Sequence, residues 1–277
     1  MKKSIITGVA LLALSSAFGQ GMSLGFKTGF NFPMAGHEMG SYREITSVNG
    51  TDTKDDEKVI YGTNGQGIPL TLDFRYMFNE HVGIQVDATY LLGMKKLMDY
   101  EKRDITAGPA TYYSESTTKV STQQFRLAPQ LVIKADKLYA RSGIVLPLFG
   151  STTGYFVNEN NLPISGSNPA NKTEVNQKLT GKFSVGFIGA IGYEMNLSDK
   201  LGLFGEVEYM GLSIKRKQAE FTKYMSGSVD VLATMTDDQK ITEYDDEINH
   251  LDANPKALGE KGFYNTLGVQ IGVRLKF

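Results

Sequence analysis

Three histidines are the residues of this sequence best suited to acid–base or metal chemistry. A neutral imidazole can take a proton or bind a metal ion, but either task needs partners at a defined spacing. His37, His81 and His250 stand far apart, and none belongs to an H-E-x-x-H pattern. No Ser-His-acid set can be placed on one rim of a fold from the sequence. We therefore expect a protein that is not an enzyme, with no catalytic residue, cofactor or metal site.

Two acidic clusters and one glycine series are weaker candidates for binding. Residues 52–57 read DTKDDE and residues 245–247 read DDE. Such clusters can bind Ca²⁺ or bridge to lipopolysaccharide through divalent ions, but they lack the spacing of a calcium loop. A solvated charge run is the favoured interpretation. Gly186, Gly189 and Gly192 recur within a strand-like run and open no helix, so they predict room for neighbouring side chains or a bend.

Nine charged residues take alternate places within otherwise apolar runs, and this spacing is the most informative pattern in the chain. Alternation with a period of two predicts a β-strand with one apolar and one polar face. Eight such runs occur, at residues 22–32, 68–78, 82–92, 125–134, 138–149, 183–195, 201–214 and 267–277. The run at 138–149 is less regular, because Val145, Pro147 and Phe149 make its second half apolar on both sides.

The connections between these runs alternate in length. Residues 79–81, 135–137 and 196–200 are short, whereas the stretches at about 33–67, 95–124, 150–182 and 215–262 are long and polar. Antiparallel strands with every short turn on one rim and every long loop on the other are typical of a membrane barrel. A soluble β-sandwich has no reason to place all its long loops at one end.

The polar faces predict what fills such a barrel. They carry Lys27, Asp73, Arg75, Asp87, Arg126, Arg141, Glu206, Glu208 and Arg274. Eight strands enclose a space barely wide enough for side chains. We expect the opposite charges to pair there as a polar plug. A narrow, gated conduction path is the alternative.

Aromatic residues gather near the predicted strand ends. Two bands of this kind are expected where a barrel meets the two membrane–water interfaces. The band on the loop side would contain Phe32, Tyr90, Phe125, Phe183, Tyr209 and Phe263. The band on the turn side would contain Tyr76, Phe78, Tyr193 and Phe277.

Export is predicted by the first nineteen residues. Lys2 and Lys3 precede a short apolar run, and Ala17-Phe18-Gly19 provides a small-residue exit before Gln20. This pattern is typical of a secretory signal peptide (residues 1–19) cleaved near Gly19/Gln20, which leaves one domain at 20–277. A retained membrane anchor is the alternative, but the apolar run is too short for one.

Composition narrows the partners. The chain has 29 Lys and Arg, two of them in the signal, against 30 Asp and Glu, which argues against a nucleic-acid partner. It has no cysteine, so no disulfide or thiol chemistry is possible.

The final run, which reads LGVQIGVRLKF and ends on Phe277, resembles the C-terminal signature of bacterial outer-membrane β-barrels. The whole pattern is similar to the small barrels of the OmpA-transmembrane, OmpX and OmpW type. The resemblance implies an all-β fold, a closed antiparallel eight-stranded transmembrane β-barrel with short periplasmic turns and long extracellular loops. It also implies an outer-membrane location, contact with membrane lipid and lipopolysaccharide, and recognition of Phe277, Leu275 and Val273 by the barrel-insertion machinery.

The last long connection contains the one helix that the sequence predicts. Thr236 and Gln239 form a capping box, and Ile241, Tyr244, Ile248 and Leu251 follow at helical spacing. Such a helix would pack as a lid on neighbouring loops or dock a partner.

Three functions follow from these patterns. The first is a non-enzymatic surface barrel whose loops bind an extracellular ligand, mediate adhesion or stabilise the envelope. An OmpW-like narrow channel for small solutes is the alternative, and an outer-membrane lipid-modifying enzyme is the third.

Overall fold

A closed ring of eight strands forms one end of the molecule. The computed structural model describes residues 21–34, 37–161, 172–248 and 256–277, so the predicted signal peptide and its cleavage point lie outside the described residues. In hydrogen-bonded order the ring consists of β1 (Met22–Pro33), β4 (Gly67–Met77), β5 (Val82–Gly93), β7 (Ala110–Ala135), β8 (Leu138–Asn160), β10 (Gly186–Asn196), β11 (Leu201–Gly211) and β17 (Thr266–Lys276). The last strand pairs antiparallel with the first and closes the ring. The predicted all-β, eight-stranded antiparallel barrel is confirmed.

The barrel turns its apolar faces outward. In β17, Val269, Ile271 and Leu275 are exposed, while Gln270 and Arg274, which alternate with the apolar residues, are buried. The other ring strands alternate in the same way. A protein that folds in water buries its large apolar residues, so this inside-out arrangement matches a wall that faces lipid.

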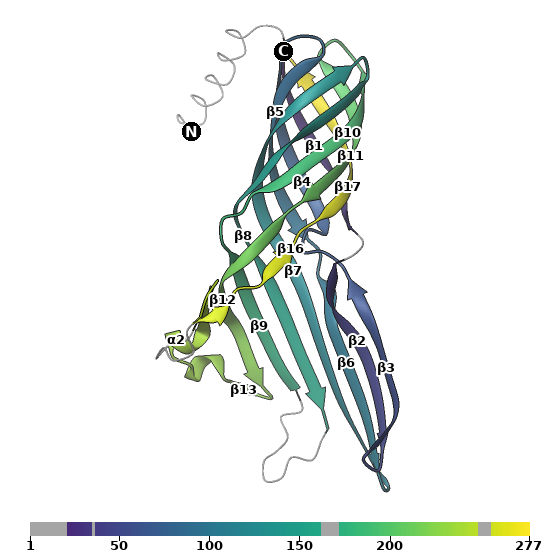
Figure 1. Cartoon of the computed structure of the whole chain (residues 1–277), viewed down its shortest axis with the longest axis vertical. Helices are drawn as coiled ribbons and strands as arrows, with labels where there is room; N and C mark the ends of the chain where they lie inside the picture. Colours follow the sequence, from purple (N-terminus) through teal and green to yellow (C-terminus); the bar gives the residue numbers. More distant parts are fainter. Residues whose placement is uncertain (1–20, 35–36, 162–171, 249–255) are drawn as a thin grey trace.

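The long connections are mostly strands, which corrects their prediction as polar loops. They contain β2 (Glu38–Val48), β3 (Thr51–Tyr61), β6 (Lys96–Ala107), β9 (Lys172–Gly181), β12 (Ser213–Ser226) and β14 (Ile241–Asp245). With the outer halves of β7 and β8 they form one sheet beyond the barrel, as the lower half of Figure 1 shows. Both faces of this extended sheet are largely accessible to solvent, so its strands lack the apolar alternation that reveals a half-buried strand.

The first two long connections are joined to each other by a parallel pairing of β2 with β6. β2 and β6 both leave the barrel rim and run side by side, with Tyr42 stacked on Tyr100 at 4.6 Å between ring centroids. β3 lies outside β2, and no further strand pairs with its free edge among the described residues. The charge run from Asp52 to Lys58 lies on this strand, and charged side chains at a free edge oppose pairing with another chain.

The predicted helix is wrong beyond its first turn. α2 (Asp237–Lys240) is a single turn in which the Gln239 side chain accepts a 2.9 Å hydrogen bond from the Thr236 amide. Ile241 starts β14, which pairs with β12, and this pairing outweighs the helical spacing of the apolar residues. Ile248 lies beyond β14 in irregular chain, and Leu251 lies outside the described residues.

Four short elements complete the loop side. They are β13 (Val229–Asp230), η1 (Leu232–Thr234), β15 (Ala257–Leu258) and β16 (Lys261–Phe263). No helix in the described part of the chain is long and apolar enough to cross a membrane.

Candidate functional site

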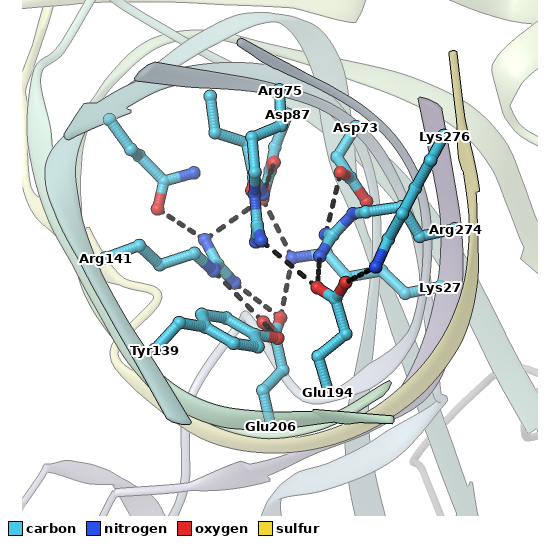
Figure 2. Close-up of polar contacts among 12 residues, drawn as sticks. Lys27, Asp73, Arg75, Asp87, Tyr139, Arg141, Glu194, Glu206, Arg274 and Lys276 are labelled. Atoms are coloured by element: carbon cyan, nitrogen blue, oxygen red, sulfur yellow. Dashed lines mark hydrogen bonds and ion pairs between the residues drawn. The ribbon is translucent and has the colours of Figure 1, made fainter. Parts of the chain in front are cut away.

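The nine charged residues of the polar strand faces all lie inside the barrel. Each is at most 5 % exposed, and eight of them take part in ion pairs that cross the lumen between strands far apart in sequence. Figure 2 shows the side chains of Lys27, Asp73, Arg75, Asp87, Arg141, Glu206 and Arg274 converging from the surrounding wall. The structure therefore brings together residues that the sequence places only on separate strands.

The middle of the lumen is filled by two cations and three carboxylates. Lys27 Nζ lies 2.8 Å from Asp87, 2.7 Å from Glu206 and 3.5 Å from Glu208. The Arg141 guanidinium lies 3.1 Å from Asp87 and 2.5 Å from Glu206 (Figure 2). It also contacts Glu208. Every carboxylate is shared by both cations, which is the multiple pairing that buried charges need.

A second cluster closes the lumen toward the short turns. Arg274 lies 3.0 Å from Asp73 and 2.5 Å from Glu194, and Arg75 lies 3.3 Å from Glu194. Lys276, at the rim, reaches the same glutamate at 2.8 Å (Figure 2). We call this cluster and the middle one together the plug.

The strand register explains why the plug needs its cations. Asp73 and Asp87 face each other directly across β4 and β5. Like charges at opposed positions destabilise a strand pair. Lys27 and Arg141 neutralise Asp87, while Arg274 neutralises Asp73.

Sequence reasoning missed three members of the plug, which are Glu194, Lys276 and Tyr139. Glu194 forms ion pairs with four cations, and Tyr139 donates a 2.8 Å hydrogen bond to Glu206. The Tyr139 ring also lies 4.6 Å from the Arg75 guanidinium, a cation–π contact. Glu194 shares the polar face of its strand with Ala190, so strict alternation would have found it. The missing side chain at Gly192 makes room for the Tyr139 ring.

Arg126 differs from the other lumen cations. It is 1 % exposed, yet it forms no ion pair and no hydrogen bond with any residue that the structure describes. It lies on β7 above the plug, on the loop side, between Thr89 of β5 and Pro147 of β8. A guanidinium has five N–H donors, so this site has donor capacity to spare.

A chamber of about 210 Å³ is lined by Gln124, the next inward residue from Arg126 on β7, and by Pro147, the ladder partner of Arg126. Its polar walls include Thr122, Gln124 and Thr152, and its apolar walls include Pro147 and Phe149. Buried apolar residues pack beside it at the upper end of the lumen, among them Val145, Ile188, Met210, Leu212 and Tyr264. The chamber therefore offers both polar and apolar contacts to a small molecule.

The barrel wall is interrupted beside this chamber. β8 pairs with β10 up to Val145–Gly186, and it pairs with β9 from Thr152–Leu179 onward. Residues 146–151 and 180–185 between them form no ladder with each other, although the register is the same on both sides. We call this interruption the wall opening. It corrects the predicted run at 183–195, since the strand begins only at Gly186.

Local sequence explains the wall opening. Pro147 lacks the N–H that a ladder requires, and Leu148 is an extra residue in a bulge opposite Phe125 and Arg126. The bulge turns Leu148 and Phe149 outward together, and both are exposed. The half of this strand that is apolar on both sides is therefore the place where regular pairing fails.

The remaining candidates do not assemble into a site. His37 stacks on Phe263 at 4.3 Å and contacts the Asn265 amide at 2.7 Å, whereas His81 lies in a turn against the Lys134 carbonyl. His250 lies outside the described residues.

The acidic clusters are held by neighbouring cations. Arg43 pairs with Asp55 at 2.6 Å, and Lys215 pairs with Asp246 at 2.9 Å. No group of three or more potential metal ligands occurs in the described ranges. Lys96, at the start of β6, has an ammonium group without a partner among the described residues, and burial lowers its pKa to about 8.

Comparison with known proteins gives a likeness in structure but none in sequence. No family model matches the chain, and no curated protein matches its sequence. Among solved structures it resembles the outer membrane protein OprG from Pseudomonas aeruginosa, with 13% identity over 93% of this chain and 96% of that chain and a TM-score of 0.36. At that TM-score the likeness assigns no activity, ligand or partner to this chain.

Proposed function

We propose that this protein is an integral outer-membrane barrel that is closed to ion flow by its plug and acts on its loop side. The observation that carries the proposal is the combination of an apolar outer wall with a lumen filled by paired charges. Such a wall is stable in lipid, whereas such a lumen leaves no continuous water path. The short turns then face the periplasm and the extended sheet faces the cell exterior.

The extended sheet and the chamber are where a non-enzymatic binding function would lie. The strands beyond the barrel hold this surface in a fixed shape. Binding sites on regular strands are positioned more precisely than sites on flexible loops. Adhesion, ligand binding and envelope stabilisation all use such a surface. Membrane lipid, lipopolysaccharide and the insertion machinery, which would read Phe277, Leu275 and Val273, are the partners this proposal includes.

Conductance of the refolded protein in a planar bilayer tests the closed lumen. We expect no discrete current steps from protein whose folding is confirmed by heat-modifiable gel mobility, because paired side chains occupy the whole lumen cross-section. The control is the same preparation with a known porin added, which must give steps. Reproducible steps from the folded protein alone would overturn the plug and favour a channel.

A second candidate function is supported by the wall opening. A small molecule in the chamber would have two routes outward, one to the loop side and one through residues 146–151 and 180–185 into the bilayer. The wall opening lies beside Phe149 and Phe183, which are exposed at the level of the aromatic band on the loop side. This arrangement would support passage of small apolar or amphipathic solutes between the exterior and the membrane.

Cysteine labelling distinguishes this route, because the chain has no cysteine of its own. Thr152→Cys places a thiol in the chamber beside the wall opening, and Thr89→Cys places one in the lumen behind a continuous wall. In nanodiscs we expect a long-chain alkyl maleimide to label Thr152→Cys at least about ten times faster than Thr89→Cys. Equal rates would exclude access from the bilayer.

A further inference from the structure

Arg126 and three amide side chains leave buried polar atoms without partners in one part of the lumen. Arg126 Nη1, Asn31 Nδ2 and Gln270 Nε2 are donors with no acceptor among the described residues, and the amide oxygens of Asn31, Gln270 and Gln124 have no donor there. All four residues are at most 4 % exposed. Burying a polar group without a hydrogen bond raises the free energy of the folded protein. Several such groups close together therefore indicate a binding site whose ligand would supply their hydrogen bonds.

The strand register places the Asn31 and Gln270 amides around the space beside Gly268. A side chain at Gly268 would begin 2.6 Å from Asn31 Oδ1 and 3.4 Å from Gln270 Nε2, so both amides border the room that this glycine leaves open. Gly268 is the ladder partner of both Asn31 and Glu208, and Glu208 belongs to the middle cluster of the plug. Arg126 lies on the loop side of the same cluster, so the amides and the guanidinium border the loop-side end of the plug.

Arg126 is also free to accept a new anion. The plug carboxylates Asp87 and Glu208 are both held by Lys27 and Arg141 within 3.5 Å. Neither lies within 4 Å of Arg126. Neither flanking side chain is hydrogen-bonded to it among the described residues, since the Pro147 ring carries no polar atom and the Thr89 hydroxyl is paired with that of Thr71 at 2.9 Å.

We propose that the lumen above the plug binds a small carboxylate-bearing amphiphile, with its carboxylate on Arg126 and the amides of Asn31 and Gln270 and its apolar part in the chamber. A guanidinium offers two parallel N–H groups, which match the two oxygens of a carboxylate. The inference rests on the proposed function, because it assumes that the plug closes the lumen and that the ligand enters from the loop side.

The chamber sets the size and character of the ligand. Its volume of about 210 Å³ equals that of roughly seven water molecules in the liquid, at about 30 Å³ each. Gln124 lines its lower, polar side, one inward position above Arg126 on the same strand, while Phe149 and Leu179 line its apolar side. A ligand of about eight non-hydrogen atoms with one charged end fits both the volume and the chemistry.

Binding of hexanoate to the full-length mature protein in nanodiscs tests the assignment. Equilibrium dialysis with labelled hexanoate, corrected with empty nanodiscs, is compared with hexanol, acetate and inorganic phosphate. We expect hexanoate to bind more tightly than any of these. Arg126→Gln should weaken hexanoate at least about tenfold while hexanol is unchanged, because a hydrogen-bonded charge pair is lost.

Two milder variants and one control variant distinguish loss of the binding site from misfolding. Asn31→Ala keeps the guanidinium and should weaken hexanoate by a smaller factor, and Arg126→Lys should retain part of the affinity. Arg43→Gln, which removes a cation from the extended sheet, should change nothing. Each variant must show the heat-modifiable mobility of the folded barrel.

Three outcomes overturn the inference. Equal binding of hexanoate and hexanol, or undiminished hexanoate binding by Arg126→Gln, would mean that lumen water satisfies these polar groups. Equal binding of acetate or phosphate would overturn the amphiphilic part of the assignment. In all three cases a silent, folded barrel would leave the proposed function intact, whereas current steps from wild-type protein would contradict that function separately.

Discussion

Replacing Arg141 by alanine is expected to lower the free energy of unfolding in lipid vesicles by about 3–5 kcal/mol. Arg141 is fully enclosed and contacts Asp87, Glu206 and Glu208. Without it, Lys27 alone would face three buried carboxylates. Breaking a buried pair is costly because it leaves uncompensated charge, and here one substitution removes three contacts.

Urea unfolding of vesicle-inserted protein, followed by the loss of heat-modifiable mobility, measures this effect. Lys54→Ala is the matched control, since Lys54 also contacts two carboxylates, Glu44 at 3.0 Å and Asp56 at 3.3 Å, but is 47 % exposed. Exposed pairs contribute roughly 0–1 kcal/mol. If both variants unfold at the same urea concentration, the plug does not stabilise the barrel. An Arg141→Ala protein that folds and conducts would show that the plug is what blocks the lumen.

Leu72→Arg is expected to destabilise the membrane-inserted barrel by about 2–4 kcal/mol, the cost of an arginine near the bilayer midplane. Leu72 lies at the middle of β4, points outward and is 55 % exposed. Its ladder partners are Phe26 and Ala88, so an arginine there would have no polar neighbour across either strand. In a protein surrounded by water the same change at so exposed a position would have little effect.

Tyr61→Arg is the matched control for this substitution. Tyr61 ends β3, is 63 % exposed and lies in the extended sheet, beyond the apolar wall. We expect its unfolding curve in vesicles to overlay that of the wild type. A Leu72→Arg protein that is equally stable would show that the apolar wall does not face lipid, and the outer-membrane proposal would fail with it.

Leu72 and Tyr61 also differ in how well their strands can be predicted from the sequence. Leu72 belongs to a strand with one face against apolar surroundings and one against charged partners, so its alternation is strict. Tyr61 belongs to a strand with solvent on both sides, and its sequence is a run of charges without period. The barrel strands could therefore be predicted from the alternation of apolar and polar residues, whereas the strands of the extended sheet, which lack it, could not.

The wall opening and the helix illustrate the other limits. Pro147 and the apolar run around it signalled an irregular strand, but the separation of β8 from β10 depends on where β9 and β12 pair. Ile241 follows a capping box and fits the helical spacing, yet it begins β14 because that segment pairs with the edge of β12. In both cases a contact distant in sequence overrides a local preference.

The sequence by itself determined the eight ring strands, the face that most of them turn inward and the nine charged residues on those faces. It did so because a wall between an apolar solvent and a polar lumen forces alternation wherever the strands pair regularly, and the alternation is lost around Pro147, where the pairing is irregular. Only the tertiary structure decided which charges meet. Closing the barrel brings Lys27 to Glu206 and Arg274 to Glu194, and it leaves Arg126 without a partner among the described residues. Lumen contacts run across the cylinder, between strands that are not neighbours, and no local pattern records them.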